Sequence, residues 1–212
     1  MFKTKAAFLA FTTLALAACS TDGQLTTEGI TVTRSACPAV AIPAGTGDIT
    51  LFNPTTSRDA NAIDVVATIT NVRSTCDETG EFITTNVTFD VQAQRRDNRG
   101  ARDVTLPYFT VVVHAGNNVV AKSVSRIGLQ FADGQYRAQT SGTATGQVLR
   151  SAATLPEAIR QQITRRRKAG DPDAALDPMA DPAVRAAVTR ASFEVLVGFQ
   201  LTEEQLRYNA TR

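Results

Sequence analysis

The sequence has no tryptophan and a single histidine, and aromatic residues amount to 6% of the chain. A metal site built on several imidazoles is therefore excluded, because such sites need more than one histidine. The sequence has no nucleophile motif such as GxSxG with which His114 could act as a general base. We therefore expect His114 to be a structural or exposed residue at a strand end. The lack of tryptophan disfavours an aromatic platform for a ligand. These shortages predict no metal, no cofactor and no catalytic set.

Neither sign of charge dominates the chain. It has 22 Lys and Arg against 20 Asp and Glu, and two of the basic residues, Lys3 and Lys5, lie in the first stretch. The remaining chain is therefore balanced at 20 basic and 20 acidic residues. Domains that bind nucleic acids carry a clear basic excess, so we expect no nucleic-acid partner.

The first 18 residues have the three parts of a secretory signal peptide. Lys3 and Lys5 supply the positive charge, residues 6–15 form an apolar run, and small residues lead into Cys19. The apolar run is shorter than the roughly 20 residues that cross a bilayer. We therefore expect residues 1–18 to be a cleaved signal peptide and not a retained membrane anchor.

The end of this stretch, Leu16-Ala17-Ala18-Cys19, resembles the lipobox of bacterial lipoproteins. The resemblance implies that Cys19 becomes the first residue of the mature chain and carries acyl chains such as palmitate, which anchor it in a membrane. In that class, Ser20 implies sorting to the outer membrane, facing the periplasm. A secreted protein with a coincidental cysteine is the alternative. Residues 19–30 are polar and predict a tether, and residues 31–212 predict a single domain.

Two further cysteines, Cys37 and Cys76, remain once Cys19 is assigned to lipid. In an oxidising compartment an even pair of cysteines predicts a disulfide. Free thiols or metal ligands are the alternative, but neither residue has a CxxC neighbour or a nearby histidine. A bridge between them would close a loop of about 40 residues and stabilise the fold by roughly 3–4 kcal/mol.

From about residue 31 to residue 150, apolar residues alternate with polar ones at the period of half-buried β-strands. The sequences Gly116-Asn117-Asn118 and Asp133-Gly134 predict hairpin turns, because Gly and Asn tolerate positive φ. The predicted strands are residues 49–52, 63–72, 82–94, 109–114, 119–124, 127–131, 135–140 and 193–201. This rhythm resembles that of immunoglobulin-like or fibronectin-like domains, although the core tryptophan of antibody domains is missing. The predicted fold is mainly β, an antiparallel immunoglobulin-like β-sandwich of about seven strands.

Residues 154–191 depart from this alternation and predict a helical insertion before the last strand. Thr154 and Glu157 fit a capping box, which would open a helix that runs to about Lys168. Three Asp-Pro pairs follow, and each fits the start of a helix or turn; they begin at Asp171, Asp177 and Asp181. Calcium binding by these aspartates is the alternative, but the spacing and the glycine of a calcium loop are absent.

A second capping box predicts a short helix at the C-terminus. Thr202 and Gln205 have the required spacing. Glu203 and Glu204 lie in its first turn, where acids interact favourably with the helix dipole. Paired carboxylates for glycoside cleavage are the alternative here, as they are for Asp77, Glu78 and Glu81, but nothing in the sequence places either group in a pocket.

Two clusters of basic residues are the remaining candidates for contact with a partner or an anion. One is expected in the loop after the longest strand and contains Arg95, Arg96, Arg99 and Arg102. The other is expected at a helix C-terminus and contains Arg165, Arg166, Arg167 and Lys168. A solvated loop and a solvated helix end are the alternative explanations, and anionic lipid head groups would also suit the second cluster.

The leading hypothesis is a non-enzymatic outer-membrane lipoprotein that acts as a binding or structural and assembly module for an envelope protein. Loops concentrate the functions of β-sandwiches, so the helical insertion is the expected partner surface. A carrier of a lipid or small apolar ligand between the sheets is the second hypothesis. An envelope enzyme is the third.

Overall fold

The computed structural model describes residues 23–26, 29–32, 35–165, 170–172 and 175–211. The chain divides into two compact units, one of residues 1–33 with 164–175 and one of residues 34–163 with 176–212. In the first unit, β1 (Gly23–Thr26) pairs antiparallel with β2 (Gly29–Val32). These strands occupy part of the stretch predicted to be a tether. The predicted signal peptide and Cys19 lie outside the described residues.

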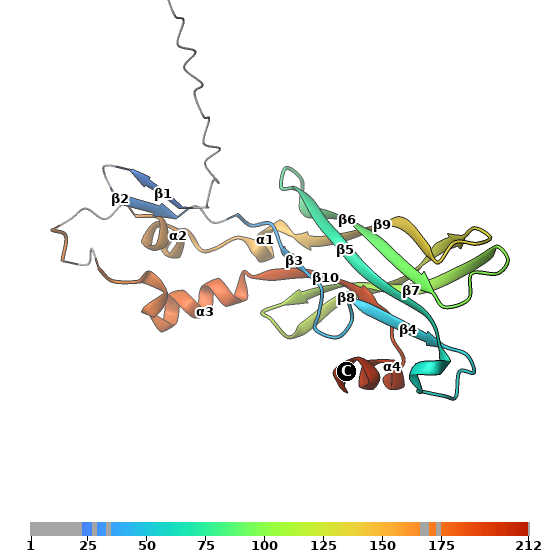
Figure 1. The fold of residues 1–212 in the computed structure, drawn as a ribbon. Helices are drawn as coiled ribbons and strands as arrows, with labels where there is room; N and C mark the ends of the chain where they lie inside the picture. Colours follow the sequence, from blue (N-terminus) through green and yellow to red (C-terminus); the bar gives the residue numbers. More distant parts are fainter. Residues whose placement is uncertain (1–22, 27–28, 33–34, 166–169, 173–174, 212) are drawn as a thin grey trace, which may run out of the picture. The chain divides into compact units, whose positions relative to one another are not determined.

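The second unit contains two four-stranded sheets (Figure 1). The first has the order β3 (Ala39–Ala41), β10 (Phe193–Phe199), β7 (Arg102–His114) and β8 (Asn118–Phe131). The second has the order β4 (Asp48–Phe52), β5 (Ile63–Asp77), β6 (Phe82–Arg95) and β9 (Arg137–Leu149). Neighbouring strands are antiparallel except for β3 and β10, which pair in parallel. The mainly β, largely antiparallel prediction is confirmed.

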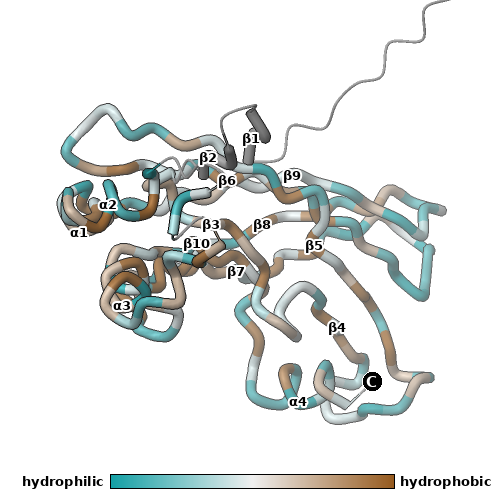
Figure 2. The backbone as a smooth tube through the Cα atoms, turned by 90° about the vertical axis from the view of Figure 1, so that its left-hand side faces the viewer, coloured by the Kyte–Doolittle hydropathy of each residue, from teal (hydrophilic) through white to brown (hydrophobic). Residues whose placement is uncertain are grey.

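The core lies between the two sheets, as the alternation predicts. Along β6 every second side chain is buried, and Val87, Phe89 and Val91 are almost completely so. One buried cluster joins these residues to Val112, Leu129 and others of the opposite sheet. In Figure 2 the apolar positions follow the strands, whereas polar positions gather in the loops. Two sheets around one core form a β-sandwich.

The strands β5, β7 and β9 extend beyond their predicted ends, and β8 joins two strands that the sequence separated. The predicted strands 119–124 and 127–131 form the single strand β8, which pairs with β7 along its length. Ser125 and Arg126 have no Gly or Pro beside them that would interrupt the backbone pairing. β8 is an edge strand of its sheet, and its residues 118–126 are exposed. Because both faces of this part are exposed, no buried face carries a period-two pattern through Ser125 and Arg126 that would join the two predicted strands.

The helices lie outside the two sheets (Figure 1). Between β9 and β10 come α1 (Arg150–Ala153), α2 (Glu157–Thr164), the 3₁₀ turn η2 (Pro178–Ala180) and α3 (Pro182–Arg190). Another 3₁₀ turn, η1 (Ala60–Ala62), precedes β5, and α4 (Glu203–Thr211) follows β10.

The helix caps agree with the sequence in three places and differ in one. Asp177 and Asp181 accept hydrogen bonds from the backbone N–H groups of η2 and α3, as predicted. Thr202 and Gln205 form the predicted capping box. Thr154 forms none: its hydroxyl donates to the carbonyl of Arg150 and so closes α1. α2 consequently begins at Glu157 and ends at Thr164, short of the predicted end.

The two sheets come into close contact at two glycines of β9. A Cβ atom added at Gly146 would lie 2.5 Å from Val195 Cγ2 on β10 of the opposite sheet. One added at Gly142 would lie 2.9 Å from Ile127 Cδ1 on β8 of the opposite sheet, and 2.5 Å from the ring of Phe89 on the neighbouring strand β6. Larger residues at these positions would force the sheets apart, because packed interiors have little free space.

We expect Gly146→Ala to destabilise the protein by about 1–3 kcal/mol, since overpacking forces side chains out of their rotamers. The free energy of unfolding from urea titration measures the effect. Gly128→Ala is the matched control, because a Cβ on Gly128, also within a strand, would meet no atom within 4 Å. Equal stabilities for the two variants would show that the sheets are not in contact at Gly146.

Candidate functional site

Arg95, the last residue of β6, has only 1% of its surface exposed. The expectation that it lies in the loop as a contact for a partner or an anion is therefore wrong, and so is the alternative of a solvated loop residue. Its guanidinium donates hydrogen bonds of 2.8–2.9 Å to the backbone carbonyls of Asn98, Gly100, Ala132 and Gln135. Its Cζ also lies 5.2 Å from the centroid of the Phe131 ring. The cause is the alternation of side chains along a strand, because position 95 continues the series of inward-facing positions of β6.

The hydrogen bonds of Arg95 tie together two loops at one end of the sandwich. Residues 96–101 connect β6 to β7, and residues 132–136 connect β8 to β9. Direct bonds between the loops reinforce this link. The Gly134 N–H donates to the Asn98 carbonyl at 2.8 Å, and the Gly100 N–H donates to Asp133 Oδ1 at 2.6 Å. The two loops therefore form one rigid surface.

A pocket of about 380 Å³ lies on this surface. We call it the end pocket; it is lined by Asn53, Asn61, Ile63, Asp64, Arg96, Asp97, Asn98, Arg99 and Tyr136. Its walls come from the loop before β5, the start of β5, and the two loops that Arg95 holds. Eight of its nine lining residues are polar, and Tyr136 has 51% of its surface exposed.

Two of the predicted arginines line the end pocket, and both have partners. Arg99 forms an ion pair with Asp97. Its Nε and Nη2 atoms donate three hydrogen bonds of 2.7–3.1 Å to the two carboxylate oxygens. Hydrogen bonds from the Arg99 side chain and backbone hold the pKa of the Asp97 carboxyl well below its usual value, so it stays ionised. Arg96 donates from Nη1 to the Asn61 carbonyl.

The fourth predicted arginine, Arg102, lines a neighbouring pocket of about 510 Å³ beside α4. Arg102 donates to both carboxylate oxygens of Asp64 at 2.6–2.7 Å, and Asp64 lines both pockets. These hydrogen bonds raise the pKa of the Arg102 guanidinium. On the far side of this second pocket, Arg58 pairs with Glu204 and lies over the ring of Phe52.

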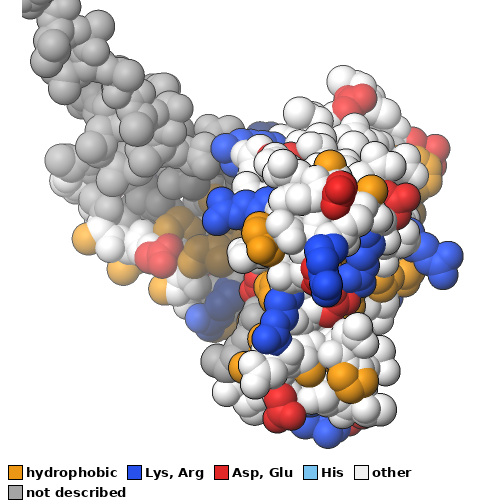
Figure 3. Space-filling view, turned by 45° about the vertical axis from the view of Figure 1, so that its right-hand side comes forward, with side chains coloured by type: hydrophobic (Ala, Val, Ile, Leu, Met, Phe, Trp, Pro, Cys, Tyr) orange, Lys and Arg blue, Asp and Glu red, His pale blue; other side chains and the backbone are white. Residues whose placement is uncertain are grey.

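Most of the charged groups that line the two pockets are in ion pairs. Arg99 pairs with Asp97, Arg102 with Asp64 and Arg58 with Glu204, whereas Arg96 donates to the neutral carbonyl of Asn61. On the face drawn in Figure 3, basic and acidic side chains lie near one another. A site selective for anions needs unpaired positive charge. Of the arginines that line the two pockets, Arg96 is the one without a carboxylate partner among the described residues, so this surface is polar with a single unpaired positive charge.

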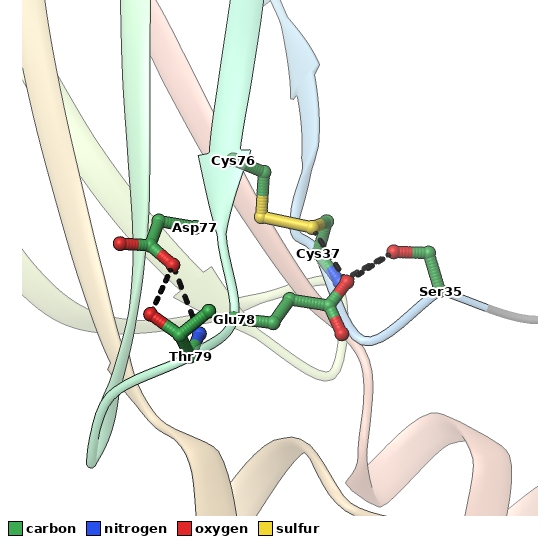
Figure 4. The surroundings of a disulfide bond; sticks show 6 residues. All are labelled: Ser35, Cys37, Cys76, Asp77, Glu78 and Thr79. Carbon is green, nitrogen blue, oxygen red and sulfur yellow. Dashed lines mark hydrogen bonds between the residues drawn. A yellow bond between two sulfur atoms is a disulfide. The ribbon is translucent and has the colours of Figure 1, made fainter.

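Cys37 and Cys76 form a disulfide, which confirms the predicted pairing (Figure 4). It connects the segment before β3 to the end of β5. Ser35 Oγ donates to Glu78 Oε1 at 2.8 Å, and the same oxygen lies 2.9 Å from Cys37 Sγ. The latter is a close contact and not a hydrogen bond, because a disulfide sulfur carries no hydrogen. Although the two sulfurs and Glu78 cluster closely enough to hold a metal ion, bridged sulfurs are no longer thiolate ligands.

His114 is held by the end of α3. Its Nε2 lies 2.6 Å from the Arg190 carbonyl, and its ring stacks on Phe193 with centroids 4.6 Å apart. The carbonyl is an acceptor, so Nε2 carries the hydrogen. An imidazole in this arrangement ties a helix C-terminus to the sheet, and within the described part of the chain it makes no hydrogen bond to a serine.

The acidic residues considered as catalytic pairs also have local partners. Asp77 accepts hydrogen bonds from the backbone and side chain of Thr79, which lower the pKa of its carboxyl. Glu203 pairs with Arg207 within α4. Asp177 and Asp181, considered as calcium ligands, are helix caps.

The second basic cluster is described only in part. Arg165 follows the last residue of α2, whereas Arg166, Arg167 and Lys168 lie outside the described residues. Its role as a contact for a partner or for lipid therefore stays a prediction. Within the described ranges, the chain has no helix of the length and apolarity that crossing a membrane requires.

Comparison with known proteins found no match to a family model, to a curated protein or to a solved structure.

The sequence did not single out several residues of this surface. Asn53, Asn61 and Tyr136 line the end pocket, and Arg58 lines the second pocket. They come from loops that lie far apart in the sequence; Asn53 and Tyr136 are separated by 83 positions. Spacing along the sequence carries no signal for such a set. Only the turn Asp133-Gly134 indicated that a loop lies beside Tyr136.

Proposed function

We propose that the protein is an outer-membrane lipoprotein of the bacterial envelope whose β-sandwich is a non-enzymatic binding module. The observation that carries the proposal is the rigid polar surface at one end of the sandwich, where Arg95 ties two loops together. Binding sites of β-sandwiches concentrate in loops on a rigid scaffold. A pre-organised surface binds with a smaller entropy loss than a flexible one.

The location outside the cytosol is supported by the cysteines. Cys37 and Cys76 form a disulfide, and such bonds persist in oxidising compartments. That pairing leaves Cys19, in its lipobox-like context, as the remaining cysteine. Two or three acyl chains on this residue would hold the chain at a membrane, since each buried CH₂ contributes about 0.8 kcal/mol.

Labelling with radioactive palmitate in a bacterial host tests the anchor. We expect label in the wild-type protein and none in Cys19→Ser, with the mature chain beginning at residue 19 by mass spectrometry. Cys37→Ser/Cys76→Ser is the matched control and should be labelled like the wild type, because its lipobox is unchanged. An unlabelled wild-type protein, or a mature chain that begins elsewhere, would refute the lipoprotein proposal.

We also propose an envelope-protein partner at residues 154–191, taken as an insertion in an immunoglobulin-like sandwich. The parallel pairing of β3 with β10 and the helices before β10 support this arrangement. Leu176 has 65% of its surface exposed and Met179 has 36%, and exposed apolar side chains favour contact with another protein.

In vivo photo-crosslinking tests this surface. A photo-reactive residue at position 176 should capture one envelope protein, while the same residue at the exposed position 117 should not. Equal capture from both positions would count against this surface.

The alternative of a carrier with an apolar cavity between the sheets has less support. Gly142 and Gly146 lie so close to Ile127 and Val195 of the opposite sheet that even an added Cβ would be within 3 Å of them. Mass spectrometry of the native protein extracted from membranes separates the two functions, because a carrier would retain a stoichiometric lipid in addition to its own acyl chains.

A further inference from the structure

We propose that the end pocket binds a neutral sugar unit of a glycan. This inference rests on the proposed function as a binding module and names the ligand class of its rigid surface. The juxtaposition that carries it is an exposed tyrosine ring beside amide side chains and a paired carboxylate, in a pocket of about 380 Å³. Sites for small ligands span roughly 300–1,000 Å³.

Most of the charge around the pocket is already paired, which favours a neutral ligand. Arg99 pairs with Asp97 through three side-chain hydrogen bonds, and Arg102 holds Asp64 through two from the neighbouring pocket. An anion entering here would meet both carboxylates and could gain only Arg96, which already donates to the Asn61 carbonyl. A sugar carries no charge, so it would not disturb either ion pair.

The hydrogen-bonding groups of the pocket match hydroxyls, which both donate and accept. The amides of Asn53 and Asn61 each offer two donor hydrogens and one acceptor oxygen. Among the described residues, these two side chains make no hydrogen bond. Asp97 is an acceptor-only group with more lone pairs than Arg99 occupies. Adjacent donors and acceptors of this kind suit the neighbouring hydroxyls of a sugar ring.

Tyr136 provides the apolar surface that a sugar ring also needs. One face of a pyranose carries C–H groups, which pack against an aromatic ring, and the phenol oxygen remains free for a hydrogen bond. Half of the Tyr136 surface is exposed. Its backbone is fixed, because the Tyr136 carbonyl accepts a hydrogen bond of 2.9 Å from the Arg95 N–H. The ring therefore stands at the rim of the pocket from a rigid position.

Hydrogen bonds within the protein preorganise the end pocket. Arg95 fixes both loops through their carbonyls, and Asn98 adds a hydrogen bond of 3.1 Å from Nδ2 to the Gly134 carbonyl. Because single sugar units make few contacts, their binding depends on walls that do not have to be ordered first. The pKa of Asp97 is low, so its acceptor oxygens remain charged from mildly acidic to neutral pH.

Titration of the full-length ¹⁵N-labelled protein, followed by NMR, tests the proposal. The probes are glucose, galactose, mannose, N-acetylglucosamine and its β-1,4-linked trimer, with inorganic phosphate and glucuronate as charged comparisons. We expect saturable shifts at Asn53, Asn61 and Tyr136 with at least one neutral probe. Tyr136→Ala and Asn61→Ala should each weaken the affinity for that probe by tenfold or more.

Two exposed residues outside the pocket supply matched controls. Phe82→Ala removes an aromatic ring that is 45% exposed, and Asn117→Ala removes an amide from the β7–β8 turn. Both should bind the sugar like the wild type. Absence of saturable shifts with every neutral probe, preference for phosphate or glucuronate, or equal weakening by controls and pocket variants would each overturn the proposal. Palmitate labelling and crosslinking from position 176 would be unaffected by such a failure, so the proposed function is tested separately.

Discussion

Replacing Arg95 by methionine is expected to destabilise the protein by about 3–5 kcal/mol. Four backbone carbonyls would lose their donor, and each buried acceptor left without a partner costs about 1–3 kcal/mol, part of which water entering the space would recover. The methionine would keep most of the apolar stem against Phe131. The loss therefore reports the hydrogen bonds and not a missing volume. Urea titration followed by circular dichroism measures the change in the free energy of unfolding.

Arg99→Met is the matched control for this experiment. Arg99 lies four positions further along the chain, and 87% of its side chain is exposed. Exposed ion pairs contribute little to stability because water and salt screen them, so this variant should unfold almost like the wild type. Arg95→Lys separates charge from geometry, because a lysine keeps the charge but cannot reach acceptors in two loops with a planar fork. Wild-type stability of Arg95→Met would refute the structural role of Arg95.

Removal of the disulfide is expected to have the second largest effect, a loss of about 3–4 kcal/mol in the double variant Cys37→Ser/Cys76→Ser. The two cysteines are 39 positions apart, so the bridge restricts a long loop of the unfolded chain. In the folded protein it holds the segment before β3 against the end of β5. Thermal unfolding with and without a reductant measures the effect.

The reductant itself supplies the control for this prediction. It should lower the melting temperature of the wild-type protein towards that of the double variant and leave the double variant unchanged, because the variant has no bridge to lose. A melting temperature of the wild type that does not respond to complete reduction, verified by thiol titration, would contradict a stabilising bridge.

Much of the sandwich could be predicted from local patterns. The alternation in residues 82–94 identifies β6 and its buried face, since successive side chains of a strand point to opposite sides. The caps at Asp177, Asp181 and Thr202 follow from short spacings whose hydrogen bonds close within three residues. At β8 the same approach divided one strand into two, because an edge strand exposed on both faces leaves no alternation to detect.

The candidate site could be predicted only in fragments. Arg96, Arg99 and Arg102 were expected together, and the structure places them around two adjoining pockets. Arg95 was grouped with them because it is charged, yet its acceptors lie as far as 40 positions away, where nothing in the neighbouring sequence points to them. The alternation of buried and exposed positions along β6 was the one available signal for its burial, and it applies only if β6 extends to residue 95.

Local chemistry in the sequence alone determined the strands with a buried face, the paired cysteines and the helix caps. Each depends on backbone sterics, short hydrogen bonds or the number of available thiols. The tertiary structure decided that a guanidinium would be buried at the end of β6, that Gly146 would face Val195, and that Tyr136 would stand beside Asn61. Those facts depend on which distant segments the sheets bring together, and a burial cost or a hydrogen bond between them exists only once both partners are in place.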